Sequence, residues 1–220
     1  MRIIKPYIIV SDFDPQSIQQ NIEKAGRVCY KSEDKITPDS SEKFINQIIK
    51  SGHESVLEHQ IISVKFICDR GITHEIARHR IAAYSQESTR YCRYSQDKFG
   101  NEITVIEPYF FKNDPITYQY WSEACRVAEK NYMALLDAGC SAQEARSVLP
   151  TCLKTEMVVT YNIREWRHFF RLRADKAAHP QMQQLAIPLL LYFKEQMPAL
   201  FGDIEYNRDF VGEYAELVIE

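Results

Sequence analysis

The chain has 220 residues, a formal net charge of −3 and a hydrophobic content of 45%. This length suffices for one domain with a substantial core. The negative charge disfavours a general nucleic-acid-binding surface, and no apolar run is long enough to predict a membrane span. The start of the sequence lacks the apolar core of a signal peptide, and the six cysteines follow no regular spacing. We therefore expect a cytoplasmic protein with free thiols, without a disulfide framework or a metal site.

Hydrophobic periodicity and turn residues predict the elements of the first half of the chain. Strands are expected over residues 2–10 and 60–69. Helices are expected over 16–30, from about 40 until Gly52, and over 72–80. A polar elbow, His53 to His59, precedes the second strand, and residues 84–94 are expected to form a loop.

The second half begins with a connective stretch that contains a possible short strand at 103–106. Further helices are expected over 116–137, from Ser141 to just before Pro150, over 163–173 and over 181–197, with a strand over 153–161. Ser141 and Glu144 have the spacing of a capping box, and Pro188 is expected to kink the last helix. The acidic tail after Phe201 is expected to be peripheral. No repeat or linker divides the chain, which favours a single domain spanning residues 1–220.

Residues 70–91, RGITHEIARHRIAAYSQESTRY, contain a concentration of arginines with only two acids, Glu75 and Glu87. Guanidinium groups and the hydroxyls of Ser and Thr are suited to holding the oxygens of a phosphate. On a helix, Arg78 and Arg80 would point about 200° apart, so one pocket cannot use both. Either the helix ends there, or two pockets or two subunits share the segment.

Other interpretations of these motifs are less favoured. The arginines could form a solvated helix face, although no acid stands next to His79. Ser88 could be a nucleophile, but no GxSxG elbow and no adjacent base accompany it. His53-Glu54 and His74-Glu75 resemble zincin motifs but lack the required second histidine. No glycine-rich phosphate loop is present, so side chains would have to hold any nucleotide.

The predicted helix over 163–173 carries a second group of cations. Arg164, Arg167, His168 and Arg171 share one face, opposite Trp166, Phe169 and Phe170. We expect Arg167 and Arg171 to be solvated on the polar face. Arg173 instead points toward the apolar side, where a guanidinium is costly unless an anion or a polar ligand meets it.

At this point the motifs resemble a known family, the flavin-dependent thymidylate synthases. The resemblance rests on Arg78-His79-Arg80 followed after seven residues by Ser88, with four further blocks in the same order and spacing. These blocks are Gly52 to His59, Ala145 to Pro150, Asn162-Ile163-Arg164, and Leu172 to Asp175. The resemblance covers roughly the whole chain. It implies an α/β (α+β) subunit with a mixed sheet flanked by long helices, assembled as a homotetramer with sites shared between chains.

The resemblance also implies the reaction. The enzyme would be a methyltransferase that converts dUMP to dTMP, with FAD as cofactor, methylenetetrahydrofolate as carbon donor and NADPH as reductant, and without an enzyme nucleophile. Arg173 would be the catalytic residue and would favour ionisation of the uracil at N3. Ser88 and Arg90 would hold the phosphate.

The resemblance assigns binding residues position by position. Those matching flavin contacts are Ser55, Arg78, His79, Arg80, Gln86, Asn162, Ile163, Arg164 and His168. Those matching dUMP contacts are Glu75, Arg78, Gln86, Glu87, Ser88, Thr89, Arg90, Arg146 and Arg173. Further candidates are His53, Glu58 and Tyr91. The chain departs from the commoner family pattern at Glu75, Ser85, Gln86 and His168, which affects individual flavin contacts most.

Two other functions remain open at this stage. A flavoprotein that oxidises or reduces another nucleotide would bind flavin and consume NADPH but form no dTMP. An RNA-binding module could use arginine and tyrosine for stacking on bases. The negative net charge and the absence of RRM or KH motifs disfavour the RNA-binding alternative.

Overall fold

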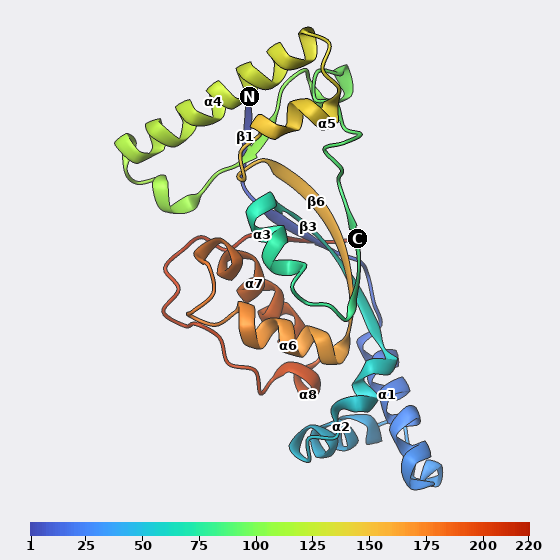
Figure 1. Ribbon diagram of the computed structural model, residues 1–220. Helices are drawn as coiled ribbons and strands as arrows, with labels where there is room; N and C mark the ends of the chain where they lie inside the picture. Colours follow the sequence, from blue (N-terminus) through green and yellow to red (C-terminus); the bar gives the residue numbers. More distant parts are fainter. The chain divides into compact units, whose positions relative to one another are not determined.

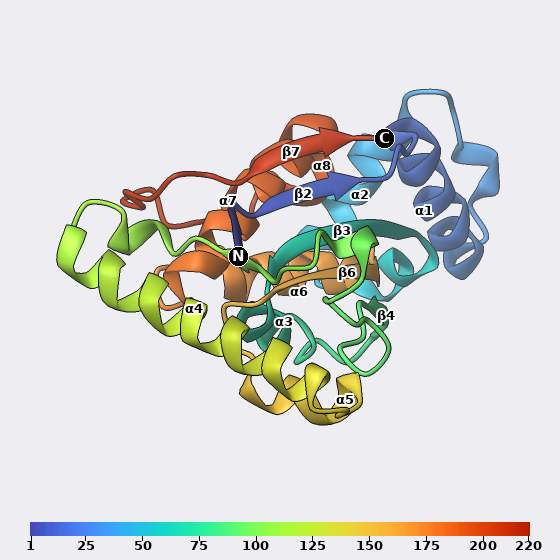
Figure 2. The ribbon, with the colours of Figure 1, turned by 90° about the horizontal axis from the view of Figure 1, so that it is seen from above.

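The computed structural model describes residues 1–220 and shows an α/β protein built around a mixed sheet (Figure 1). Five strands form this sheet in the order β4-β6-β3-β2-β7, and β1 pairs in parallel with β5 in a second, two-stranded sheet. The strands are β1 Arg2–Ile4, β2 Tyr7–Val10, β3 Ile61–Asp69, β4 Ala82–Gln86, β5 Thr104–Ile106, β6 Lys154–Asn162 and β7 Glu216–Ile219. Figure 2 shows β7, β2, β3 and β6 following one another across the larger sheet.

The helices account for most of the remaining ordered backbone. The α-helices are α1 Pro15–Tyr30, α2 Ser40–Lys50, α3 Arg70–Ile76, α4 Pro115–Asp137, α5 Ala142–Ala145, α6 Ile163–Arg173, α7 Pro180–Gln196 and α8 Pro198–Phe201. Short 3-10 helices lie at Glu33–Lys35, Glu54–His59, Asp97–Phe99, Tyr109–Phe111 and Arg146–Val148. None of these helices combines the length and the apolar character that crossing a membrane requires.

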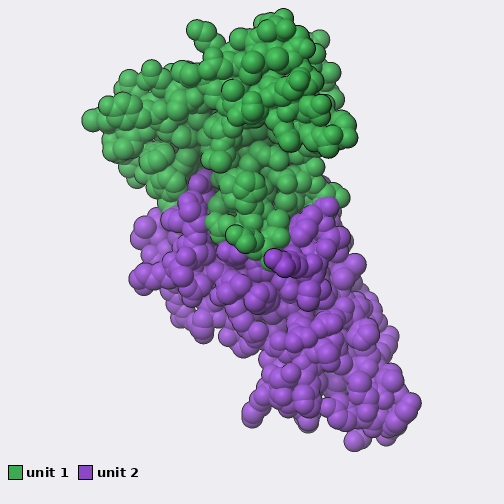
Figure 3. All heavy atoms as spheres, in the orientation of Figure 1, with its two compact units in different colours: residues 1–7, 66–78, 85–158 green, residues 8–65, 79–84, 159–220 purple.

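The chain divides into two compact units, coloured separately in Figure 3. Unit 1 comprises residues 1–7, 66–78 and 85–158. Unit 2 comprises residues 8–65, 79–84 and 159–220. Each unit is assembled from three separate stretches of sequence, so neither could be recognised as a continuous segment.

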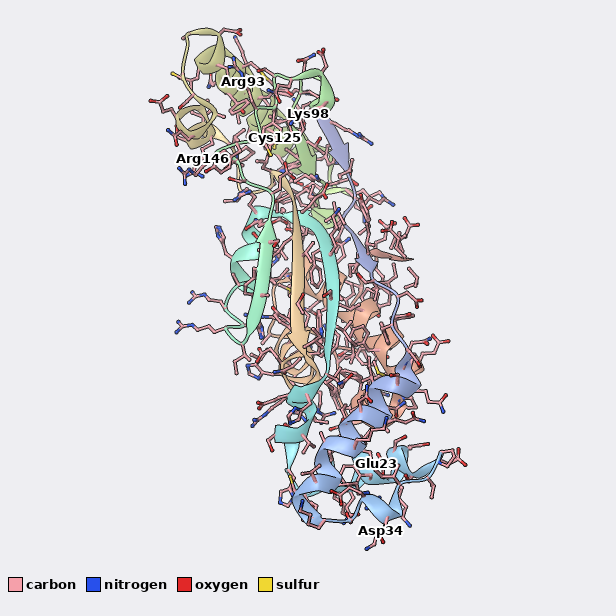
Figure 4. The ribbon with its side chains drawn as sticks, turned by 90° about the vertical axis from the view of Figure 1, so that its right-hand side faces the viewer. Glu23, Asp34, Arg93, Lys98, Cys125 and Arg146 are labelled. Carbon is pink, nitrogen blue, oxygen red and sulfur yellow. The ribbon has the colours of Figure 1, made fainter.

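Unit 1 is organised around the long helix α4. Asp114 caps its N-terminus by accepting a hydrogen bond from the backbone N–H of Ile116 at 3.0 Å, and Pro115 takes the first helical position. Gly139 follows the helix with a φ of +94°, a conformation that favours glycine. The core of this unit contains Tyr94, Ile103, Val105, Cys125, Tyr132, Leu136, Ala145 and Leu153. Figure 4 labels Cys125 within this region.

Unit 2 has an aromatic core that joins its C-terminal helices. α6 packs against α7, and α7 packs against α8. The fully buried aromatic rings are Tyr161, Trp166, Phe169, Phe170, Phe193 and Phe201. Trp166 also donates a hydrogen bond from its indole Nε1 to the backbone oxygen of Ile62 at 3.1 Å, which ties α6 to β3. The apolar stripe predicted for α6 therefore faces the core of unit 2.

Several expected boundaries differ from the structure. The strand predicted over 2–10 is divided into β1 and β2, because Pro6 lies between them and lacks a backbone donor. The predicted loop at 84–94 begins as strand β4, and α3 ends at Ile76 instead of Arg80. The tail is not peripheral, since β7 joins the sheet beside β2 and Glu220 donates from its backbone N–H to the oxygen of Val10 at 3.1 Å.

Candidate active site

The Arg78-His79-Arg80 segment lies in the turn that follows α3. Asp69 caps this helix by accepting a hydrogen bond from the backbone N–H of Ile72 at 2.8 Å, and Ala77 ends it. Past the helix, Arg78 and Arg80 are exposed, whereas His79 is buried with 3% of its surface accessible. The helix ends before Arg78, which is one of the alternatives left open for this segment. The two arginines face solvent on either side of a histidine that belongs to the interior.

His79 lies at the centre of a hydrogen-bonded chain in unit 2. Its Nδ1 lies 2.8 Å from Oε1 of Glu165, and its Nε2 accepts a hydrogen bond from Nε of Arg173 at 3.2 Å. Glu165 is buried and Arg173 is half-buried. Arg173, expected to point toward the apolar side of its helix, is thus partly shielded from solvent, and its neighbour is a histidine 94 residues away in the sequence.

Only one protonation state of His79 satisfies both partners. The Nε–H of a guanidinium can only donate, so Nε2 of His79 must be unprotonated, and the proton on Nδ1 is donated to Glu165. Burial lowers the pKa of His79 below its ordinary value of 6.5, against the raising effect of Glu165, and the charges of Arg173 and His168 lower it further. The imidazole is thus held neutral beside a fixed cation.

Two tyrosines support His79 from the strands. Tyr84 donates from its hydroxyl to the backbone oxygen of His79, and the hydroxyls of Tyr84 and Tyr161 lie 3.0 Å apart. Burial raises the pKa of both tyrosines, so both stay protonated. The ring of Phe169 lies 5.2 Å from that of His79, centroid to centroid, on the apolar side. These contacts fix the position of the imidazole.

The sequence did not identify Glu165 as a residue of the site, because its spacing from Asn162 indicates a helix cap. Asn162 is the N-cap of α6 and accepts a hydrogen bond from the backbone N–H of Glu165 at 2.8 Å. An Asn followed three residues later by Glu indicates an N-terminal cap, so Glu165 would be assigned to the cap. In the structure its carboxylate bonds His79 instead.

The elbow before β3 lines a pocket of about 420 Å³ in unit 2. Its lining includes Ser55, His53 and Arg164 together with apolar side chains such as Phe44 and Val56. Arg164 forms an exposed ion pair with Glu58 at 2.6 Å, and Nδ1 of His53 lies 3.0 Å from the hydroxyl of Tyr30. The structure therefore brings Ser55, His53 and Arg164 together around one hollow and places Glu58 against Arg164.

The remaining predicted flavin residues of unit 2 differ in accessibility. Arg80 and His168 are exposed, and the ring of His168 lies 5.3 Å from that of His79. Ile163 is fully buried and donates its backbone N–H to the oxygen of Gln60 at 2.9 Å. The side chain and N–H of Ile163 are thus committed within the protein, whereas Asn162 is half-buried and Arg164 is exposed.

A second hollow, of about 250 Å³, lies in unit 1. Arg70, His74, Thr89 and Arg146 contribute to its lining. Arg146 donates from Nη1 to Oγ1 of the buried Thr89 at 3.3 Å, and Arg70 donates from Nη1 to the backbone oxygen of Glu87 at 3.2 Å. Two guanidinium groups and a threonine hydroxyl therefore surround one small pocket, a composition suited to an anion. Arg70 is a pocket residue to which the family resemblance assigns no contact.

The loop after β4 places the other predicted nucleotide residues. Ser88 Oγ accepts a hydrogen bond from the backbone N–H of Arg90 at 3.3 Å. Arg90 and Tyr91 are exposed, with the guanidinium 5.6 Å from the centre of the tyrosine ring. Glu75, on α3, is half-buried. No base accompanies Ser88 among its hydrogen-bonding partners, in agreement with a binding role.

Gln86 and Glu87 make separate sets of contacts. Gln86 donates from Nε2 to the hydroxyls of Thr73 and Thr155, at 3.0 and 3.3 Å. The carboxylate of Glu87 instead pairs with Lys154 at 3.1 Å and accepts from the hydroxyl of Tyr94 at 2.9 Å. Glu87 therefore shares the ammonium group of Lys154 with Glu156, whose carboxylate lies 2.5 Å from Nζ.

The expectation that Arg167 is solvated is wrong. Its side chain is fully buried, and its Nη1 and Nη2 lie 2.7 and 2.8 Å from the carboxylate oxygens of Asp203. The backbone oxygen of Leu200 accepts a further hydrogen bond. Helical periodicity could not reveal these partners, because they come from the segment that follows α7. Arg171 is exposed, as expected.

His79, Glu165 and His168 are close enough to be considered as metal ligands, since their donor atoms lie within 4.8 Å of one another. Both ring nitrogens of His79 are already occupied, by Glu165 and by Arg173. A cation would also meet the positive charge of Arg173 at this position. The arrangement is better suited to orienting the guanidinium than to binding a metal.

The fold and these arginine-lined hollows define an α/β protein suited to anionic, nucleotide-like ligands. Comparison with known proteins makes this assignment specific. Residues 12–199 match the model of the family described as thymidylate synthase complementing protein, and the chain belongs to this family.

The relatives of the chain carry a consistent name. It is 33% identical over 197 residues to a flavin-dependent thymidylate synthase of Geobacter sulfurreducens, covering 86% of this chain and 82% of that protein. It is 35% identical over 202 residues to the flavin-dependent thymidylate synthase of Mycobacterium avium, covering 84% and 78%. The fold is similar to that of a UMP/dUMP methylase from Streptomyces cacaoi bound to 5-Br dUMP. That match has a TM-score of 0.77 at 21% identity and covers 92% of this chain and 96% of the other.

Proposed function

We propose that this protein is a flavin-dependent thymidylate synthase that methylates dUMP to dTMP. The carbon comes from methylenetetrahydrofolate and the reducing equivalents from NADPH, through FAD. Family membership and the names of the relatives support this proposal. The observation that carries it within the site is the guanidinium of Arg173, half-buried and held at Nε by neutral His79.

Arg173 is the proposed catalytic residue. A cation fixed where water is scarce stabilises a developing negative charge more strongly than the same cation in solvent. Beside the uracil, Arg173 would favour loss of the N3 proton and raise the electron density at C5, the position to be methylated. This role requires no covalent attack by the enzyme, and Ser88 has no base that would activate it.

For the nucleotide, unit 1 supplies the phosphate-binding side chains. Arg146, Thr89 and the neighbouring Ser88 and Arg90 offer the guanidinium and hydroxyl donors that a phosphate monoester needs. The full proposed dUMP set is Glu75, Arg78, Gln86, Glu87, Ser88, Thr89, Arg90, Arg146 and Arg173. Within it, Glu87 would act by holding the loop in place, because its carboxylate pairs with Lys154 and its backbone N–H donates to the oxygen of Glu156 at 2.9 Å.

For the cofactor, unit 2 supplies a hollow and exposed cations. The pocket at Ser55 combines apolar walls with Arg164. Arg80, the residue after His79, is exposed. This composition suits a ligand with an aromatic ring system and a diphosphate. The proposed FAD set is Ser55, Arg78, His79, Arg80, Gln86, Asn162, Ile163, Arg164 and His168, with His53, Glu58 and Tyr91 as further candidates. When bound, the flavin relays reducing equivalents from NADPH.

The homotetramer also belongs to this proposal. The exposed apolar side chains Ile116, Tyr120 and Val127 fall within about 60° of one another around α4, which leaves a stripe without a partner in the single chain. A monomer seldom exposes such stripes, so an interface between copies would explain it. Sedimentation equilibrium should give four chains per particle, and a monomeric particle would remove this part of the proposal.

The activity itself is tested by chromatography of the nucleotide product. Purified protein should form dTMP only when FAD, NADPH, dUMP and methylenetetrahydrofolate are all present. NADPH oxidation with no dTMP under the complete conditions would favour the alternative, a flavoprotein acting on another nucleotide.

A further inference from the structure

The first observation is that Glu165 and Arg173 are joined through an imidazole instead of meeting directly. Both lie on α6, eight residues apart, which corresponds to a rise of about 12 Å along the helix. His79 lies between them, 2.8 Å from the carboxylate and 3.2 Å from the guanidinium. We propose that Glu165 is a positioning residue, which sets the tautomer of His79 and through it the orientation of the Arg173 guanidinium. This inference rests on the role proposed above for Arg173.

The direction of each hydrogen bond determines which tautomer of His79 is required. Nε of Arg173 always donates, so it requires a lone pair on Nε2 of His79. A neutral imidazole has two tautomers, and only an acceptor at Nδ1 selects the one with Nε2 free. Glu165, as a buried carboxylate, is such an acceptor. With the other tautomer, two N–H groups would face each other and the hydrogen bond between Arg173 and His79 would be lost.

The groups around His79 come from α6 and from the strands. From α6, His79 faces Glu165, His168, Phe169 and Arg173. From the strands, the hydroxyl of Tyr84 bonds the backbone oxygen of His79, and the ring of Tyr161 lies 5.9 Å from the imidazole. Among these groups, Glu165 is the one whose side chain bonds Nδ1. Its negative charge also offsets part of the positive charge of Arg173 in a region of low solvent access.

The test compares Glu165→Gln with Glu23→Gln. Glu23 is likewise a buried carboxylate on a helix of unit 2, paired with Arg27 at 2.8 Å, and controls for the loss of a buried charge (Figure 4). Nitrogen-15 NMR of the imidazoles should show a protonated Nδ1 for His79 in the wild type and in Glu23→Gln. In Glu165→Gln, an amide can donate or accept, so the two tautomers should mix. An unchanged tautomer in Glu165→Gln would overturn the proposal.

A second readout follows the effect to Arg173. In the wild-type background, Glu165→Gln should weaken dUMP binding and lower kcat/KM about 10-fold or more, the size expected for losing a hydrogen bond to a charged group. In an Arg173→Ala background, where turnover is lost, the same substitution should change the dissociation constant for dUMP less than about 2-fold, because the group it positions is gone. An equal loss in both backgrounds would mean that Glu165 does not act through Arg173.

The two levels of inference can fail separately. If Arg173→Ala leaves dTMP formation intact, the role of Arg173 is wrong, whereas the NMR measurement still decides whether Glu165 sets the tautomer. If Glu165→Gln does not fold, Glu165→Asp retains the charge and the acceptor with one methylene less. The aspartate variant should keep the wild-type tautomer, and a mixed tautomer in that variant would contradict the proposal.

Discussion

Arg146 donates a hydrogen bond from Nη1 to the hydroxyl of Thr89, which joins the end of α5 to the loop after β4 across 57 residues of sequence. Thr89 is buried and Arg146 is exposed, so the contact fixes the base of the pocket and leaves the cation at its edge. Neither Arg146 nor Thr89 alone would indicate a binding site. Their contact at the edge of the pocket indicates an anion-binding site.

Arg146→Ala should weaken dUMP binding about 10-fold or more, because a charge-assisted contact to the phosphate is lost. Binding of deoxyuridine, which lacks the phosphate, should be nearly unchanged. Isothermal titration with both ligands measures the difference. Equal losses for dUMP and deoxyuridine would show that Arg146 supports the loop and does not contact the phosphate.

Arg173→Ala should fold and retain flavin while losing dTMP formation, because the cation beside the uracil is absent. Arg171→Ala is the matched control on the same helix, since Arg171 is exposed and lies 3.4 Å from Glu54. Its effect on turnover should be within about 2-fold, as expected for a surface ion pair. Turnover at the wild-type rate in Arg173→Ala would contradict the assigned role.

Turnover should fall as the pH decreases below about 6.5. Burial lowers the pKa of His79 below its ordinary value of 6.5, so the ring stays neutral at neutral pH and gains its proton only in acid. Protonation turns Nε2 into a donor facing Arg173 and breaks their contact. The unfolded chain binds this proton at higher pH than the folded chain, so stability also decreases as the pH falls through this window.

The variant His79→Gln tests the pH prediction. Its amide can donate to Glu165 and accept from Arg173, yet it does not titrate. The kcat profile between about pH 5 and pH 8 should therefore lose its acidic limb or have a shallower one. An acidic limb at the wild-type position would assign the titration to another group.

Arg167→Ala should destabilise unit 2 by about 2–5 kcal/mol, because it removes the contacts of a fully buried side chain and leaves a cavity. Asp203→Asn should also destabilise the unit, because the fully buried guanidinium of Arg167 would lose its two-point carboxylate partner and keep Glu54 at 3.4 Å. Urea unfolding curves of the wild type and both variants, fitted with one common m-value, give the two changes in the free energy of unfolding. A neutral Arg167→Ala variant would mean that the pair contributes little to stability.

The parts of the fold that could be predicted are those that depend on local patterns. α1, α4 and α6 follow the apolar periodicity of their sequences, with Asp14, Asp114 and Asn162 as caps. β4 was missed because its pairing partner, β6, lies far away in the sequence. β7 was missed for the same reason.

In the candidate site, too, the features that depend on local sequence were predicted and those that depend on tertiary contacts were not. The placement of Arg173 toward the apolar side of α6 follows from helix geometry, whereas the turn at residues 78–80 was expected to be helical. The partners of His79 and of Arg167 do not follow from local sequence, because Glu165 and Asp203 reach them through tertiary packing. A carboxylate at the third position of a helix is ordinarily assigned to its cap, and only the structure shows that Glu165 turns toward His79.

The central claim is that this protein couples flavin reoxidation to methylation of dUMP. The most direct measurement is the visible absorption of the FAD-loaded protein under anaerobic conditions, first with NADPH and then with dUMP and methylenetetrahydrofolate together. The spectrum should bleach on addition of NADPH and recover only when both substrates are present, with dTMP formed in proportion to the flavin reoxidised. Recovery without dTMP, or no recovery with both substrates present, would contradict the account.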